Sequence, residues 1–253
     1  MNLRGCYTLF YKELLRFFKV ALQTVMAPVV TALLYLLVFA HVLEDRVQVF
    51  GEIGYTVFLV PGLIMMSVIQ NAFANSSSSL IQSKVTGNIV FILVSPLSYL
   101  ELYLAFVGAA LARAVVVGLG VWAVAAAFVS VPLEHPGWAL LFMVLGGAVL
   151  GTLGVIAGIS AEKFDQLAGF QNFIIVPLSF LSGVFYSLHS LPPFWQQLSR
   201  FNPFFYMIDG FRYGFFGVAD VHPGLSLAVT AGAWLALAGL TLVMLQRGYK
   251  LRN

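Results

Sequence analysis

The stretch WALLFMVLGGAVLGTLGVIAGI, residues 138–159, carries no charged side chain. A helix needs about 20 apolar residues to cross the hydrocarbon core of a bilayer, and this run is long enough. Gly147, Gly151, Gly154 and Gly158 fall at steps of four, three and four, so they share one face of such a helix. A glycine face allows two helix backbones to approach closely. The stretch therefore predicts a membrane helix packed against another helix, on this chain or on a second copy.

The composition extends this interpretation to the whole chain. Of its 253 residues, 60% are hydrophobic and 9% are charged, whereas a soluble domain has about 25% charged residues. The apolar runs are long and do not alternate strictly, which favours helices over a barrel. We expect an all-α polytopic membrane protein that forms a single transmembrane domain over residues 1–253. Six spans are predicted, at residues 20–40, 55–73, 102–129, 138–159, 168–186 and 225–245.

The positions of lysine and arginine predict the orientation, because cytoplasmic loops carry an excess of these residues. With six spans, most of the cations fall on one side, which is then the cytoplasm, and both termini lie there. The chain is thus expected to be a multi-pass protein of the bacterial inner membrane. The cytoplasmic set is Arg4, Lys12, Arg16, Lys19, Lys84, Lys163, Arg247, Lys250 and Arg252, and the outer set is Arg46, Arg200 and Arg212.

Residues 1–19 have the pattern of an amphipathic helix rather than of a signal peptide, because charges are spread through them. Such a helix lies in the membrane interface and contacts lipid. The alternative is a cytoplasmic extension of the first span. Apolar residues at helical spacing are Phe10, Leu14, Phe17, Phe18 and Ala21, and Lys12, Arg16 and Lys19 lie on another face.

Residues 187–218 are too apolar for a solvated loop and too interrupted for a span. LPPFWQQLSRF and NPFFYMIDGFRYGFF each predict a short helix that begins at a proline, such as Pro203, where the missing N–H costs least. We expect a re-entrant helical hairpin that dips into the outer leaflet between spans five and six. Asp209 and Arg212, three residues apart, can form an ion pair there. The alternative is a surface salt bridge on an interfacial helix.

Polar side chains form stripes on two of the predicted spans. Such stripes face other helices or a water-filled path, so both a transport path and interhelical hydrogen bonding stay open. Arg113 lies within the third span, where it can reach the cytoplasmic surface or pair with Glu162 or Asp165. The stripe residues are Ser67, Asn71 and Asn75 in the second span and Asn172, Ser179, Ser182 and Tyr186 in the fifth.

Several kinds of site are not supported by the sequence. No lysine follows a glycine, so the chain lacks the G-x-x-x-x-G-K-[ST] phosphate loop and is not expected to hydrolyse ATP. The single cysteine, Cys6, excludes an internal disulfide. The small net charge of +3 does not indicate binding to nucleic acid. No catalytic residue, bound cofactor or metal is expected, since no metal-binding spacing joins His41, His135, His189 and His222.

Between the second and third spans, NIVFILV predicts a short helix along the cytoplasmic surface that ends before Pro96. The run is too short to span a bilayer. An exposed apolar face at this position needs either lipid headgroups or a protein partner.

The whole chain resembles the permease subunits of ABC-2 type exporters, and in particular the YadH-type bacterial inner-membrane permeases. This family includes drug, lipo-oligosaccharide and polysaccharide export permeases. The resemblance is carried by VPGLIMMSVIQNAFAN (60–75), LVSPLS (93–98), GVFYSLHSLPPFWQQLSRFNPFFYMIDGFRYGFFG (183–217) and QRGYKLRN (246–253).

The resemblance implies a homodimer bound to two copies of a separate ABC ATPase, which binds ATP and Mg²⁺. Residues 84–96 would be the coupling helix that docks on the ATPase, and the outer hairpin would cap the exit of the path. Relatives usually carry charged residues in the coupling helix, where this chain has Val90, Phe91 and Ile92, so a more hydrophobic docking is expected. The implied coupling residues are Lys84, Asn88, Ile89, Val90, Phe91, Ile92 and Leu93, with Glu162, Lys163 and Asp165 in a second contact loop.

The leading hypothesis is an ATP-driven exporter that moves an amphipathic, lipid-linked or drug-like substrate outward across the inner membrane. The alternatives are an ion- or proton-coupled carrier and a membrane scaffold that does not transport.

Overall fold

A computed structural model describes residues 2–43, 48–49 and 53–251; Arg46 and Arg252 lie outside this part of the chain, as does the side chain of His41. Five of its helices are long and apolar enough to cross a membrane. This confirms the prediction of an all-α polytopic membrane protein. The helices are α2 (Ala21–Leu43), α3 (Tyr55–Val85), α5 (Tyr99–Ala126), α6 (Pro136–Ser160) and α11 (Pro223–Arg247).

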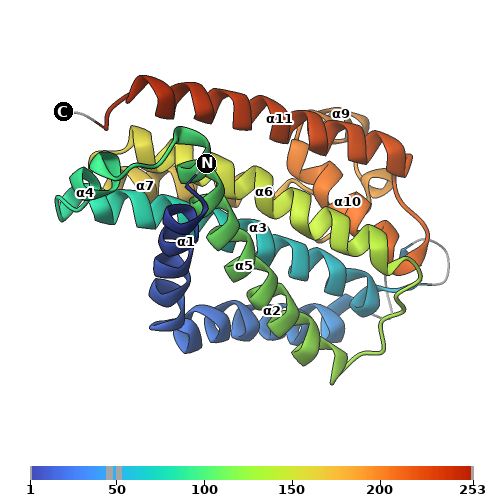
Figure 1. The fold of residues 1–253 in the computed structure, drawn as a ribbon. Helices are drawn as coiled ribbons and strands as arrows, with labels where there is room; N and C mark the ends of the chain where they lie inside the picture. Colours follow the sequence, from blue (N-terminus) through green and yellow to red (C-terminus); the bar gives the residue numbers. More distant parts are fainter. Residues whose placement is uncertain (1, 44–47, 50–52, 252–253) are drawn as a thin grey trace.

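Shorter elements occupy the two ends of this bundle (Figure 1). We call one end the α4 end, because it holds α4 together with the start of α1, α7 and the end of α11. The other is the hairpin end, where α9 and α10 lie. The shorter elements outside the fifth predicted span are α1 (Leu3–Phe18), the antiparallel pair β1 (Gln48–Val49) and β2 (Ile53–Gly54), α4 (Ile89–Val94), the 3₁₀ turn η2 (Leu188–Ser190), α9 (Pro193–Arg200) and α10 (Pro203–Phe216).

The fifth predicted span is a broken helix. It consists of α7 (Phe164–Phe170), the π-helical turn η1 (Gln171–Ile175) and α8 (Val176–Phe180). Pro177 has no N–H to continue the α-helical pattern, and a π-turn immediately before a proline accommodates that loss. The helix ends at Phe180, so the predicted end at residue 186 is wrong. These elements together rise about 25 Å, which is less than the hydrocarbon core of about 30 Å, and the six-span count stays a prediction.

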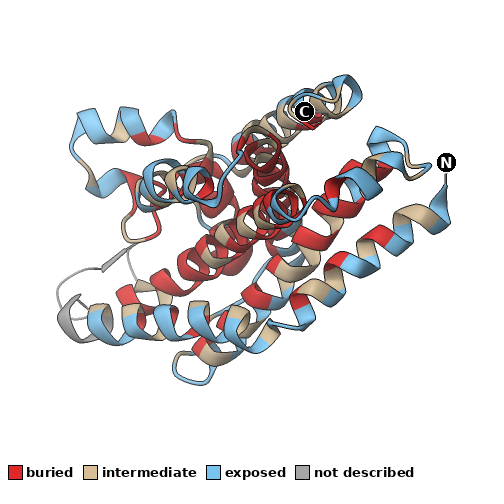
Figure 2. Ribbon diagram, turned by 90° about the vertical axis from the view of Figure 1, so that its left-hand side faces the viewer, coloured by how far each residue is buried: buried red, intermediate tan, exposed pale blue. Residues whose placement is uncertain are grey.

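Helix α3 lies at the centre and packs against α5, α6 and α10. Figure 2 shows the buried residues gathered in the middle of the bundle and exposed ones on the outer helices. The predicted second span ends at residue 73, but α3 continues to Val85. The polar run after residue 73 is helical because its small side chains, such as Ser76, Ser77 and Ser79, are buried against neighbouring helices.

The glycine face of α6 packs within the chain. A Cβ added to Gly154 would lie 2.5 Å from the carbonyl oxygen of Phe73, and one added to Gly158 would lie 2.7 Å from the Cβ of Leu80. Gly147 and Gly151 approach α5 instead, at Leu111 and Ala110. The close helix contact predicted from the glycine spacing is therefore confirmed, and its partners are α3 and α5 of the same chain.

We expect Gly154→Ala to lower the stability of the folded chain by about 1–3 kcal/mol. The new methyl group meets the backbone of α3, which cannot yield as a flexible side chain can. The thermal unfolding midpoint of the detergent-purified protein measures this. Gly239→Ala in α11 is the matched control, since a Cβ there meets nothing within 4 Å; equal effects of the two substitutions would contradict the contact.

Candidate functional site

The two predicted coupling segments lie together at the α4 end. Lys84 Nζ, near the end of α3, donates hydrogen bonds to the carbonyl oxygens of Ile159 and Ala161, at 2.7 and 2.6 Å. It thereby caps the end of α6, just before the loop that carries Glu162. Lys250 Nζ lies 3.1 Å from Glu162 Oε1 and adds the C-terminal segment to the same surface. Lys84 thus ties the two segments together, and its ammonium group is already occupied.

The loop predicted as the second contact with the ATPase is exposed to solvent. Glu162, Lys163 and Asp165 are all exposed, and Asp165 lies in the first turn of α7. These residues offer charges of both signs at the same end of the molecule as α4.

Helix α4 presents a bare apolar surface between two membrane-length helices. Val90, Phe91 and Val94 are 57%, 77% and 79% exposed, whereas Ile89 is buried and anchors the helix. Asn88 is exposed, and Ile92 and Leu93 are half-buried. An exposed helix with this composition is suited to insertion into an apolar groove of a partner.

Short turns join α4 to its neighbours. Gly87 adopts a φ of +74° in the turn that leads from α3 into α4, a conformation that glycine adopts without strain. Ser98 and Glu101 form a capping box that begins α5 soon after α4 ends. Helix α4 is therefore held between the ends of two long helices, α3 and α5.

Helix α1 is fastened to α3 by a buried charged group. Glu13 is fully buried, accepts a hydrogen bond from Ser79 Oγ at 2.6 Å, and pairs with Lys12 at 2.9 Å and Arg16 at 3.0 Å. Arg16 also donates to the backbone and side-chain oxygens of Asn75, at 2.8 and 3.1 Å. Burial opposes ionisation of Glu13, but the Ser79 hydrogen bond and the two cations outweigh it and lower its pKa.

Sequence reasoning placed the cations of α1 correctly on one face but missed Glu13. The spacing of Glu13 from Arg16, and the serine run that follows Asn75, were the available indications. The predicted apolar face is also only partly right, since Phe17 is buried whereas Phe18 is 60% exposed. The helix itself is confirmed, and its position in the membrane interface stays a prediction.

Two asparagines of the polar stripe on α3 accept hydrogen bonds from Arg16 and Arg113. Asn75 binds Arg16, and Asn71 Oδ1 accepts hydrogen bonds from Arg113 Nη2 and Nε, at 3.0 and 3.3 Å. The predicted pairing of Arg113 with Glu162 or Asp165 is therefore wrong, because an amide one helix away already supplies the acceptor. Ser67 and Asn71 also line a cavity of about 190 Å³ between α2 and α3.

The second predicted stripe does not join the first. Asn172 is exposed on η1, and Tyr186 is half-buried in the turn after α8. Ser179 and Ser182 are fully buried, and their hydroxyl groups donate to the backbone oxygens of Ile175 and Ser179. Among the described residues that line the α2–α3 cavity, none comes from this stripe.

At the hairpin end, α9 and α10 both begin at a proline, as predicted. Pro203 occupies the first turn of α10, and Asn202 caps that helix by accepting the Phe204 N–H at 3.0 Å. The amide of Asn202 also donates to the carbonyl oxygen of Leu178 at 2.7 Å, which links the hairpin to α8.

Asp209 and Arg212 are both fully buried, but neither an ion pair nor a hydrogen bond joins them. Asp209 accepts hydrogen bonds from the backbone N–H of Asp220 at 2.7 Å and from Ser226 Oγ at 3.2 Å. Burial raises the pKa of Asp209 to about 6, although the Asp220 N–H and the charge of Arg212 oppose this. Both the predicted direct pair and the surface salt bridge are therefore wrong.

Arg212 instead faces α3 and the turn after α8. Its Nη2 donates to the carbonyl oxygen of Gly183 at 2.7 Å, and its guanidinium carbon lies 3.9 Å from the centroid of the Phe58 ring. Sequence reasoning also missed Asp220, which is buried and accepts hydrogen bonds from Ser187 Oγ and from the Leu188 N–H. The hairpin is thus fixed by separate contacts to α3 and to the segment before α11.

We expect Asp209→Arg and Arg212→Asp each to destabilise the chain by about 3 kcal/mol or more, because buried partner groups lose their hydrogen bonds. Combining the two substitutions should not restore stability, since the residues are not direct partners. Thermal unfolding in detergent tests this. Reversing both charges of the exposed pair Lys250 and Glu162 is the control, where each single change costs little and the double reversal restores the parent value. Rescue at positions 209 and 212 would contradict this geometry.

Comparison with known proteins gives a consistent assignment. A profile of the ABC-2 type transporter family matches residues 4–216. The inner membrane transport permease YadH of Escherichia coli strain K12 is 39% identical over 242 residues, which cover 96% of this chain and 94% of that protein.

More distant relatives have names that refer to nodulation and to export of a capsule polysaccharide. Nodulation protein J of Rhizobium leguminosarum bv. trifolii is 26% identical over 216 residues, or 85% of this chain and 81% of that protein. The capsule polysaccharide export inner-membrane protein BexB of Haemophilus influenzae is 30% identical over 110 residues, which cover 42% of this chain and 38% of that protein. The profile match and the similarity to YadH, with the membrane-length helices, show that this chain belongs to the ABC-2 type transporter family, whose permeases are multi-pass membrane components that generally work with an ABC ATPase.

Proposed function

We propose that this chain is the permease subunit of an ATP-driven exporter in the bacterial inner membrane. Two copies of the chain would bind two copies of a separate ATPase, which holds ATP and Mg²⁺. The observation that carries the proposal is the exposed apolar helix α4, held between α3 and α5 and flanked by the exposed loop at residues 162–165.

Helix α4 is suited to act as the coupling helix. Its outer face offers Val90, Phe91 and Val94 to a groove on the ATPase, whereas Ile89 holds the helix to the bundle. Because α4 is joined to two long helices by short turns, movement of the ATPase would be transmitted to those helices. Lys84 would act indirectly, since its contacts with the end of α6 keep the second loop beside α4.

The distribution of cations supports a cytoplasmic α4 end. Lys84 and Arg247 lie at the ends of α3 and α11, and Lys163 and Lys250 lie just before α7 and just after α11. Figure 1 shows α7 and these ends of α3 and α11 at the α4 end. An excess of lysine and arginine is typical of the cytoplasmic side. Both termini would then be cytoplasmic, and the hairpin end would face outward.

The substrate would be amphipathic, lipid-linked or drug-like. Ser67 and Asn71 supply a few polar groups to an otherwise mostly apolar cavity between α2 and α3. We retain these residues as path candidates, whereas the backbone contacts of Ser179 and Ser182 favour a structural role. The name of BexB, which refers to export of a capsule polysaccharide, supports outward movement.

The outer hairpin would cap the exit of the path. Pro203 begins α10, and Asp209 and Arg212 fix that helix to the segment before α11 and to α3. These contacts would let the hairpin move as one unit when the two copies change conformation.

We expect Phe91→Asp to abolish co-purification of the co-expressed partner ATPase, because a carboxylate in an apolar groove is strongly disfavoured. Detergent extraction of the co-expressed pair, followed by size-exclusion chromatography and an assay of ATP hydrolysis, measures this. Phe201→Asp is the matched control, since Phe201 is 86% exposed at the hairpin end. If the ATPase binds the Phe91→Asp chain as well as the parent, α4 is not the docking element.

A distance measurement tests both the homodimer and the energy source. Cys6 is the single cysteine, so a Cys6→Ser, Phe201→Cys chain can carry one spin label at the hairpin end. In nanodiscs with the ATPase, we expect a label-to-label distance between two copies, and ATP with vanadate should shift it. A change of pH without ATP should not. A shift with pH but not with ATP would favour a proton-coupled carrier, and the absence of any distance would contradict the homodimer.

A further inference from the structure

Helix α1 has three distinct sectors around its axis. Leu9, Glu13 and Phe17 face the bundle and are buried. Next to them, Lys12, Arg16 and Lys19 form a cationic sector. The remaining sector is an exposed apolar stripe, made of Leu3, Tyr7, Tyr11, Leu15 and Phe18. A helix with these three sectors can contact protein, a polar space and lipid at the same time.

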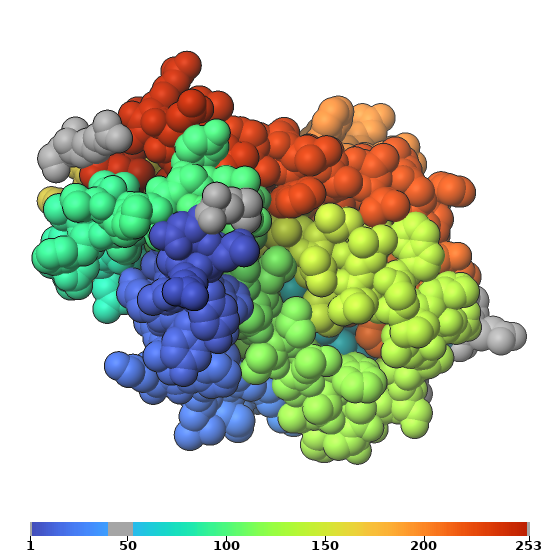
Figure 3. Space-filling model, in the orientation of Figure 1, coloured from blue at the N-terminus to red at the C-terminus, as the bar shows by residue number. Residues whose placement is uncertain are grey.

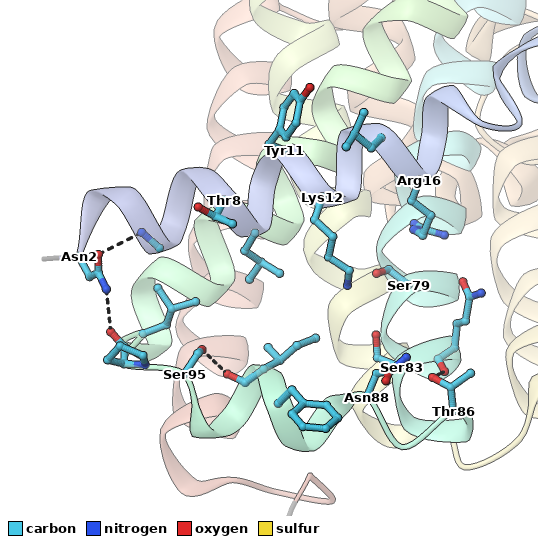
Figure 4. Close-up of a pocket in the computed structure, with 18 of the residues that line it drawn as sticks. Asn2, Thr8, Tyr11, Lys12, Arg16, Ser79, Ser83, Thr86, Asn88 and Ser95 are labelled. Carbon is cyan, nitrogen blue, oxygen red and sulfur yellow. Dashed lines mark hydrogen bonds between the residues drawn. The ribbon is translucent and has the colours of Figure 1, made fainter.

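The cationic sector borders a cavity of about 930 Å³ between α1 and α4. Figure 4 shows Lys12 pointing from α1 into this space, with Ser79 and Ser83 of α3 at its side. Figure 3 shows α1 and α4 next to each other on the same face of the molecule. The volume is in the range of pockets that bind small ligands.

Both ends of the cavity are built by contacts between α1 and its neighbours. At one end, Asn2 donates a hydrogen bond to the carbonyl oxygen of Pro96 at 3.4 Å. At the other end, Glu13 and Arg16 hold α1 to Ser79 and Asn75 of α3. The space is therefore a formed part of the fold.

The lining combines positive charge, hydroxyl groups and apolar surface. Lys12, Arg16 and Lys19 line it, and none of the described lining residues is a carboxylate. The nearest compensating charge that contacts them is Glu13, which is shared between Lys12 and Arg16. Three cations against one carboxylate leave a net positive charge. Apolar contact comes from Leu9, Phe91, Ile92 and Leu97. Hydroxyl groups of Thr8, Ser79, Ser83 and Thr86 also line the cavity, but those of Thr8, Ser79 and Thr86 already donate to Arg4 O, Glu13 and Gln82 O.

Tyr11 and Leu15 belong both to the exposed stripe and to the lining. The edge of the cavity is thus continuous with the surface that would face lipid at the membrane interface. Lysine and arginine side chains bind phosphate oxygens well, whereas the neighbouring stripe suits acyl chains. We propose that the cavity between α1 and α4 binds the phosphate headgroup of an anionic membrane lipid, whose acyl chains lie along the α1 stripe. This rests on the proposed interfacial position of α1.

Native mass spectrometry of the detergent-purified chain, titrated with phosphatidylglycerol or phosphatidylcholine, tests the site without the ATPase. We expect selective retention of phosphatidylglycerol. Lys12→Gln combined with Lys19→Gln should weaken this binding roughly tenfold or more, since each cation near an anionic lipid contributes measurably. Lys163→Gln combined with Arg247→Gln also removes two cations, but neither residue lies on α1 or lines the cavity; its effect should stay within about threefold.

A second pair of variants separates the cavity from general charge attraction. Thr8→Trp fills the lining without changing the charge and should also weaken binding, whereas Leu240→Trp should not, since Leu240 lies 51% exposed in α11 and does not line the cavity. Equal losses in the two double variants, or unchanged binding by Thr8→Trp, would overturn the proposal. Displacement of the lipid by millimolar inorganic phosphate would overturn the assignment to lipid and indicate a free-phosphate site. Each of these results is independent of whether the Phe91→Asp chain loses the ATPase.

Discussion

The close approach of α3 and α6 is the contact on which the rest of the structure depends. Gly154 and Gly158 leave room for the α3 backbone, and no larger residue fits without displacing it. Because α6 comes so near, α3 can be buried along most of its length, including its serine-rich end. That buried end provides the surface on which α1 docks, and it also holds the start of α4. The shape of the α4 end therefore follows from a glycine contact in the last turns of α6.

Much of the fold could be predicted from local patterns in the sequence. A helix in a membrane must satisfy its own backbone hydrogen bonds, so long apolar runs identify spans reliably, and prolines identified the starts of α9 and α10. What these patterns missed has physical causes of another kind. The polar residues after Phe73 were predicted only as a tail of the second span, and they continue the helix to Val85 because their serines are covered by α1 and α6. The fifth span was predicted as continuous, whereas Pro177 is preceded by a π-turn. Local patterns do not report such packing.

The partners of the charged residues at the candidate sites were also hard to predict from local sequence patterns. Asp209 and Arg212 are close in sequence and opposite in charge, yet each binds backbone groups that are distant in sequence, at Asp220 and Gly183. Arg113 binds an amide, and Lys84 binds carbonyl oxygens at the end of α6. A backbone dipole satisfies a buried charge without requiring a second buried charge, whose desolvation is costly. Sequence spacing between opposite charges is therefore an incomplete guide to their partners: Glu13 and Arg16, three residues apart, do form an ion pair, whereas Asp209 and Arg212 do not.

These contacts bear on how α4 would work. One side of α4 is exposed apolar surface, and residues such as Phe91 and Ile92 also border the cavity beneath α1. A partner on the exposed side and a lipid in the cavity would thus contact the same short helix. Helix α1 connects both ends of this arrangement: Asn2 donates to the carbonyl oxygen of Pro96 just before α5, and Glu13 accepts a hydrogen bond from Ser79 of α3. If both occupants bind, the free energy of lipid binding would bias the position of the coupling helix, and the ATPase would in turn bias lipid binding by the same amount. The buried carboxylate of Glu13 would then matter for coupling as well as for stability, because it keeps α1 against the helix from which α4 extends.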